Sequence, residues 1–140
     1  MRDVERAKQF LSDGATFALV KDVEVFSTDR KGIAPLLELA EQGKNLSGFS
    51  AADKIVGKAA AMLYCYMGIA EVYAEVLSQA ALDMFEKHGV TCSYGKLVDY
   101  IINRKGDGMC PMEVAVKNLS HPAQAVHALR EKLNSLANKS

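Results

Sequence analysis

A run of twelve residues without a charged side chain, Ala59 to Ala70, is the feature that most restricts how this chain can fold. The run lies between Lys58 and Glu71, and most of it is apolar on every side of a helix. A membrane-spanning helix needs about 18 to 20 such residues, so the run is too short to cross a bilayer. We therefore expect a buried central helix in a soluble protein.

The composition fits one domain of ordinary size. The chain has 140 residues, of which 49% are hydrophobic, enough for a single core. Seventeen basic and seventeen acidic residues give a formal net charge of +0, so no overall charge attracts nucleic acid or an anionic membrane. The N-terminal residues carry mixed charge without a following apolar segment, which predicts a cytoplasmic protein. The cysteines lack CxxC spacing and are expected to be reduced: Cys65, Cys92 and Cys110.

The first third of the chain shows a helix, a hairpin and a second helix. Apolar spacing predicts the first helix over residues 3–11. Two apolar and β-branched runs, 15–20 and 23–27, are close enough to form an antiparallel hairpin. The second helix is expected over residues 33–42, followed by a polar loop at 44–49.

The next segment has the spacing of a long helix. Ser50 is the expected N-cap, Asp53 lies in the first turn, and Gly68 ends the predicted helix, which covers residues 50–67. Its apolar positions are Ala52, Ile55, Val56, Ala59, Ala60, Leu63 and Met67.

Strand and helix patterns then alternate. A strand is predicted over residues 71–77, a helix that Ser78 caps runs to residue 88, and a short strand follows at 90–94. Residues 96–103 are ambiguous. We favour a short helical or irregular stretch there, leading into a turn at 104–108.

Two helices are predicted at the end of the chain. Pro111 after Cys110 is typical of a first helical position. The last helix, residues 121–138, is too short for a coiled coil but suits docking on the domain or homodimerisation. Its apolar side consists of Val126, Leu129, Leu133 and Leu136.

This order of elements predicts the α/β class, as a three-layer α/β/α sandwich with a mixed sheet whose antiparallel edge is the hairpin. The order resembles the cytidine-deaminase-like fold. Three segments look like the motifs of a small prokaryotic family, without an established reaction, that is placed in that fold: VGKAAA at 56–61, EVYAEVLS at 71–78 and INRKGDGMCPME at 102–113. The resemblance runs from about residue 10 to about residue 119 and implies a single deaminase-like domain over residues 1–140.

The zinc-deaminase motifs are absent at the corresponding places. Zinc deaminases have a His or Cys with a Glu at the start of one core helix and Pro-Cys-x-x-Cys at the start of the next. Residues 50–54 are SAADK and residues 78–82 are SQAAL, so neither segment offers a zinc ligand. The cysteines and the histidines also lack zinc-type spacing. We expect no metal and no cofactor, although a nucleotide is an expected bound molecule.

An anion site is expected where the core helices begin, because helix N-termini present free N–H groups and partial positive charge. Lys54 and Lys58 are four residues apart on one face of the predicted long helix, and Asp53 and Ser78 are further ligand-binding candidates. The alternative is a pair of solvated lysines. Gly57 and Lys58 do not form a Walker A motif, since the flanking glycine and Ser or Thr are missing.

The segment 103–113 is rich in functional groups for a connection. Arg104 is a candidate for bidentate binding of a phosphate or carboxylate, and Asn103 for binding an amide or hydroxyl. The alternative is a polar turn.

Cys110 is the candidate nucleophile. It precedes Pro111 at a predicted helix N-terminus, where the helix dipole favours the thiolate. Glu113 or Asp107 would then act as acid or base. The alternatives are a cysteine that packs as a small hydrophobe and a glutamate that caps its own helix.

Three functions follow as hypotheses. The first is a zinc-free deaminase-like domain that binds a nucleotide or a similar anionic small molecule. The second is a metal-independent enzyme or covalently modified protein that uses Cys110. The third is a structural or regulatory homo-oligomeric subunit. The expected partners are the small anionic ligand and a second copy of the chain, without a membrane or a nucleic acid polymer.

Overall fold

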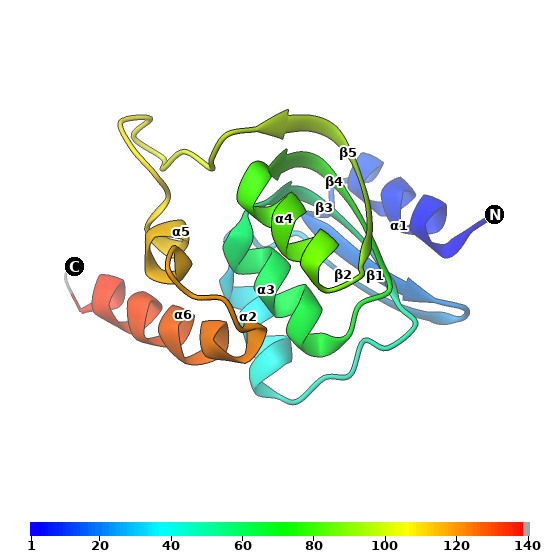
Figure 1. Cartoon of the computed structure of the whole chain (residues 1–140). Coiled ribbons are helices and arrows are strands. Elements are labelled where there is room, and N and C mark those ends of the chain that lie inside the picture. Colours follow the sequence, from blue (N-terminus) through cyan, green and yellow to red (C-terminus); the bar gives the residue numbers. More distant parts are fainter. Residues whose placement is uncertain (139–140) are drawn as a thin grey trace.

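The computed structural model describes residues 1–138 and contains a five-stranded mixed sheet with helices on both faces (Figure 1). The predicted α/β/α class is confirmed, and residues 139 and 140 of the predicted domain lie outside the described residues. The elements are α1 (Asp3–Ser12), β1 (Phe17–Lys21), β2 (Glu24–Thr28), α2 (Ala34–Glu41), β3 (Ser50–Val56), α3 (Lys58–Met67), β4 (Glu71–Ser78), α4 (Gln79–Lys87), β5 (Thr91–Val98), α5 (Pro111–Val116) and α6 (Pro122–Ala137).

The strand order is β2-β1-β3-β4-β5. Strand β1 pairs antiparallel with both β2 and β3, as the predicted hairpin requires, and β3, β4 and β5 are parallel. Because parallel strands end at the same side of a sheet, β3, β4 and β5 end where α3 and α4 begin. We call this side the carboxyl edge.

The two faces of the sheet are covered unequally (Figure 1). Helix α1 packs alone against β1, β3 and β4, around a small core that includes Ala7 and Leu11. Helices α3 and α4 cover the other face, and α2, α5 and α6 pack against α3 from outside. The main core therefore lies between the sheet and α3.

The predicted helix over residues 50–67 is wrong in its first half. Residues 50–56 form β3 and only residues 58–67 are helical, so Lys54 and Lys58 do not share a helix face and Asp53 lies on a strand. Strand β3 lies between β1 and β4, and its first four residues are all buried, with no alternation to mark a strand. Among residues 1–138, no helix combines the length and apolarity that a membrane span requires.

Strand β5 is longer than the sequence predicted. This strand extends to Val98, so the favoured helical or irregular structure is wrong for residues 96–98. Residues 99–110, which we call the arm, leave the carboxyl edge and return to α5 (Figure 1). A single antiparallel bridge between Ile102 and Met109 closes the arm. The loop predicted to be polar also differs, because Leu46 and Phe49 are buried.

One row of neighbouring residues across the three parallel strands is not paired. It consists of Lys54 on β3, Glu75 on β4 and Gly95 on β5, and the pairing on both sides of it has the same register. The core-facing positions shift across this row, since Val72 and Leu77 of β4 both belong to the main core although they are five residues apart. The offset is the same on both sides of this row, so no residue is inserted into any of the three strands.

Helix α6 docks on its own domain. Ala125 and Leu129 are fully buried, and α6 contacts α2, α3 and α5. The Arg130 guanidinium donates two hydrogen bonds, of 2.6 and 2.7 Å, to the Glu41 carboxylate at the end of α2. The apolar side predicted for docking or dimerisation thus packs within the chain, and a homodimer through α6 stays a prediction.

We expect Leu129→Ala to lower the free energy of unfolding by about 2 to 5 kcal/mol, because it leaves a cavity between α6 and the core. Leu136→Ala on the same helix is the control, since Leu136 is 38% exposed and its truncation should cost less than about 1 kcal/mol. Urea denaturation measures both values. Equal small losses would show that α6 is not part of the cooperative fold.

Candidate functional site at the carboxyl edge

The carboxyl edge gathers some of the predicted site residues and excludes others. Lys58 and Ser78 lie at the starts of α3 and α4, and Glu113 reaches the same edge from α5. Asp53 and Lys54 lie further back on β3. The predicted set is therefore divided between the edge and the sheet.

Glu113 caps α3 rather than its own helix. Its Oε1 accepts a hydrogen bond of 2.7 Å from the backbone N–H of Lys58, and Oε2 accepts one of 2.9 Å from Ala59. Burial raises the pKa of the Glu113 carboxyl, while these two N–H groups and the Lys58 ammonium act in the opposite direction. The start of α3 thus already holds an oxyanion, supplied by the chain itself.

Gly57 is required for this contact. A Cβ on residue 57 would lie only 2.3 Å from Glu113 Oε1 and 2.7 Å from Oε2. The backbone of Gly57 is extended, a conformation that any residue can adopt. Glycine is therefore needed here because there is no space for a side chain. The conspicuous Gly57-Lys58 pair, which is not a Walker motif, is explained by the approach of Glu113.

Lys58 makes a second contact between α3 and α5. Its Nζ donates a hydrogen bond of 3.0 Å to the carbonyl of Lys117, the residue that follows α5. Partial burial lowers the pKa of the Lys58 ammonium, although the nearby Glu113 opposes this shift. Helices α3 and α5 are therefore tied by two reciprocal caps, and we call this pair of contacts the α3–α5 clamp.

The start of α4 is more open. The buried Ser78 hydroxyl accepts a hydrogen bond of 3.1 Å from the backbone N–H of Ala81, as expected for an N-cap. Gln79 and Ala80 are exposed and carry the first two N–H groups of the helix, which have no intrahelical acceptors. An external anion therefore has better access to α4 than to α3.

Asn103 organises the tip of the arm. Its side-chain oxygen accepts from the backbone N–H of Gly106 at 2.8 Å and of Asp107 at 3.2 Å, and its amide donates to the Asp107 carboxylate at 2.8 Å. Asn103 is thus used within the turn. The adjacent Arg104 and Lys105 are exposed, and neither has an ion-pair partner among residues 1–138.

Cys110 is the N-cap residue of α5, a helix of only six residues. Its carbonyl accepts from the backbone N–H of Glu113, but the Glu113 carboxylate is bound to α3. The Asp107 carboxylate is bound to Asn103. Both predicted acid or base partners therefore serve other contacts, and nucleophilic use of Cys110 stays a prediction.

Sequence reasoning named Asp53 as a ligand-binding candidate in a first helical turn, whereas the structure places it on β3 with a partner that the sequence did not identify. The carboxylate is buried against α3, where its Oδ2 accepts a hydrogen bond of 2.7 Å from the hydroxyl of fully buried Tyr64. Its Oδ1 accepts from the backbone N–H of Ile55, next to the interrupted row. Burial raises the pKa of Asp53 to about 7, partly offset by the Tyr64 hydrogen bond, and the same surroundings raise the pKa of Tyr64.

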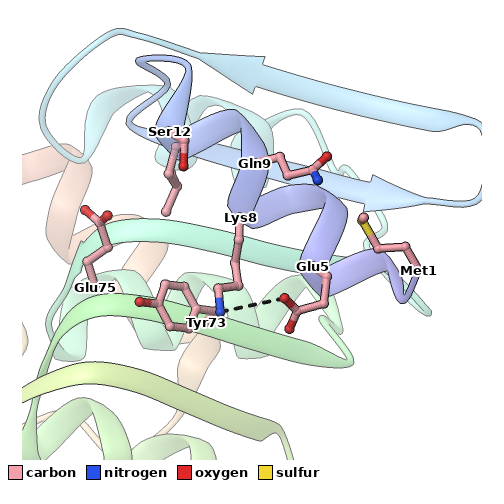
Figure 2. A pocket seen from close by; sticks show the side chains of 8 residues that line it. Met1, Glu5, Lys8, Gln9, Ser12, Tyr73 and Glu75 are labelled. Atoms are coloured by element: carbon pink, nitrogen blue, oxygen red, sulfur yellow. Dashed lines mark ion pairs between the residues drawn. The ribbon is translucent and has the colours of Figure 1, made fainter.

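A hollow of about 260 Å³ lies on the opposite face of the sheet, between α1 and β4 (Figure 2). Its polar lining includes Glu5 and Lys8 from α1, and Tyr73 and Glu75 from β4. No sequence motif pointed to it, because the lining joins residues that are almost 70 positions apart in the chain. We call it the α1 hollow.

The helix starts can now be compared with the zinc-deaminase motifs. The sequence analysis compared residues 50–54 with the first motif, which stands at the start of a helix. These residues lie on β3, and the helix that follows, α3, starts only at Lys58. Residues 78–82 do begin a helix. Residues 1–138 contain no group of three or more His, Cys, Asp or Glu side chains placed to hold a metal ion.

Known proteins resemble this chain in sequence and structure. Residues 6–133 match the model of a family described as TM1506, a domain of unknown function (DUF1893). The crystal structure of a DUF1893 family protein (TM1506) from Thermotoga maritima has a TM-score of 0.85 and 27% identity, and covers 94% of this chain and 91% of that one. A diaminohydroxyphosphoribosylaminopyrimidine deaminase/5-amino-6-(5-phosphoribosylamino)uracil reductase from the same organism has a TM-score of 0.42 and 16% identity, over 66% of this chain and 35% of that one. No curated protein matches.

We expect Gly57→Ala to lower the free energy of unfolding by about 1 to 3 kcal/mol, because the added Cβ displaces Glu113 and leaves helix N–H groups unpaired. In a Glu113→Ala background the same substitution should cost almost nothing, since the obstructing carboxylate is gone. Urea denaturation of the four proteins gives the coupling. Additive effects would contradict the proposed contact.

We expect stability to depend on pH through Asp53. Its folded pKa of about 7 lies above the ordinary 3.8, so between these values the folded chain holds a proton that the unfolded chain has released. Stability therefore falls as pH rises through this window, by about 4 kcal/mol in total. Asp53→Asn stays neutral and should lose this fall, as thermal unfolding between pH 4 and pH 8 would show.

Tyr64→Phe is the control, because it removes the hydrogen bond but keeps the carboxyl. It should be less stable than the original protein and retain the decline with pH. A decline of the same size in Asp53→Asn would assign it to another group.

Proposed function

The chain belongs to the TM1506 family (DUF1893), and from its carboxyl edge we propose that it binds a nucleotide or a similar small anionic molecule. This proposal is the first hypothesis of the sequence analysis, a zinc-free deaminase-like domain that binds a small anionic molecule. The observation that supports the proposal is the Glu113 carboxylate on two backbone N–H groups of α3, at 2.7 and 2.9 Å. It supports the proposal because an oxyanion of the chain itself already binds a helix start at this edge.

The proposed ligand contacts are at α4 and the arm rather than at α3. The N–H groups of Gln79 and Ala80 offer a second helix start, which no side chain of residues 1–138 fills beyond the Ser78 cap. Arg104 adds a guanidinium without an ion-pair partner among residues 1–138, suited to bidentate contact with a phosphate.

The other candidates have supporting roles in this proposal. Asn103 holds the turn that presents Arg104, and Lys58 ties α5 to α3. Asp53 and Lys54 belong to the sheet and not to the ligand contacts. The proposal is one of binding without a catalytic step, since the predicted partners of Cys110 are engaged elsewhere.

We expect AMP to bind and adenosine to bind at least about tenfold more weakly, because the phosphate supplies the charge-assisted contacts. Arg104→Ala should weaken AMP binding by about tenfold or more. Isothermal titration measures these affinities, and native mass spectrometry of the freshly purified protein shows whether a nucleotide-sized molecule accompanies the chain.

Lys105→Ala is the matched control, since Lys105 is the exposed neighbour of Arg104 on the same turn. It should change AMP affinity by less than about twofold. The proposal fails if Arg104→Ala leaves the affinity of AMP unchanged, or if adenosine binds as tightly as AMP. A mass adduct on Cys110 that survives denaturation would favour the covalent alternative.

A further inference from the structure

The α1 hollow lies on the face of the sheet opposite α3 and α4, so it is separate from the ligand contacts proposed above. Helix α1 is the only helix on this face among residues 1–138, and it leaves Tyr73 and Glu75 of β4 partly open beside it. The hollow, about 260 Å³, is smaller than pockets that enclose drug-sized molecules. Any ligand it holds is therefore a small one.

An ammonium group already lies in this hollow. Lys8 Nζ is 4.2 Å from the centroid of the Tyr73 ring and 3.8 Å from Glu5 Oε2. Figure 2 shows Lys8 against the ring, with the carboxylates of Glu5 and Glu75 on opposite sides of it in this view. A ring face and a carboxylate are the groups that attract an organic cation, and here they surround one supplied by the chain.

The backbone of β5 leaves room for the Tyr73 ring. A Cβ on residue 95 would lie 3.3 Å from the Tyr73 hydroxyl and 2.9 Å from the carbonyl oxygen of Glu75. Gly95 and Glu75 belong to the row that the parallel pairing skips. Gly95 therefore leaves space beside β4 for the Tyr73 hydroxyl.

We propose that the α1 hollow binds a small organic cation with a primary amine, at the position that Lys8 fills in this structure. The Tyr73 ring contacts the ammonium, and Glu5 and Glu75 neutralise it. The lining contains two carboxylates, Glu5 and Glu75, together with the Lys8 ammonium and Met1 at the start of the chain. Gln9 and Ser12 at the rim supply further hydrogen-bonding groups. Lys8 competes with the ligand for the ring and for Glu5.

The test removes the competing ammonium. Putrescine, a four-carbon diamine, is titrated into the protein and into Lys8→Met, with 1,4-butanediol as the uncharged probe of equal length. We expect Lys8→Met to bind putrescine about fivefold more tightly than the original protein, with no response to the diol. Amide NMR shifts should concentrate at Tyr73, Glu75 and Gly95. Adding Glu75→Gln to Lys8→Met should weaken binding by about threefold or more.

Lys21→Met is the matched control, because it removes the same charge from another place where a lysine faces a ring, with Nζ 5.9 Å from the Phe49 centroid. It should leave putrescine affinity unchanged. An equal gain in Lys21→Met would assign the effect to overall charge and overturn the proposal. No binding by Lys8→Met, or shifts spread over all acidic surfaces, would overturn it as well. None of these outcomes bears on AMP binding at the carboxyl edge.

Discussion

The α3–α5 clamp joins the start of α3 to α5 across 55 residues of the chain. Two N–H groups of α3 meet the Glu113 carboxylate, and the Lys58 ammonium meets the carbonyl that follows α5. Both contacts satisfy backbone groups that a helix end leaves unpaired. The arm and α6 are attached to either end of α5, and α6 is also held by its own contacts with α2 and α3. A glycine at position 57 leaves the space that the Glu113 carboxylate occupies.

Burial raises the pKa of both buried carboxyl groups, Glu113 and Asp53, because it disfavours the charged form. The groups that oppose this rise differ: helix N–H groups and the Lys58 ammonium for Glu113, and a tyrosine hydroxyl with backbone N–H groups for Asp53. Glu113 holds α5 through its two hydrogen bonds to the start of α3. Asp53 contributes most as a neutral acid, beside the row where the pairing of β3 and β4 is interrupted.

Local patterns predicted the elements that depend on local chemistry. The hairpin, the apolar helix α3, the Ser78 cap and α6 all follow from spacing and turn residues. Strand β3 was mistaken for helix because a central strand buried on both faces has no alternation. The sequence flagged Glu113 as a cap but suggested its own helix, since nothing local identifies a partner 55 residues away. The α1 hollow was missed for the same reason, as Lys8 and Tyr73 meet only in the folded sheet.

The separation of 55 residues between Lys58 and Glu113 also has a consequence for a chain that emerges from the ribosome. Strands β1 to β4 and helix α3 precede Glu113 in the sequence, so they are made before the cap of α3 exists. During that interval the first N–H groups of α3 are available to water or to any dissolved oxyanion. An α3 that forms before residue 113 is made therefore has one more open anion-accepting helix start than the finished protein, and the arrival of α5 fills it.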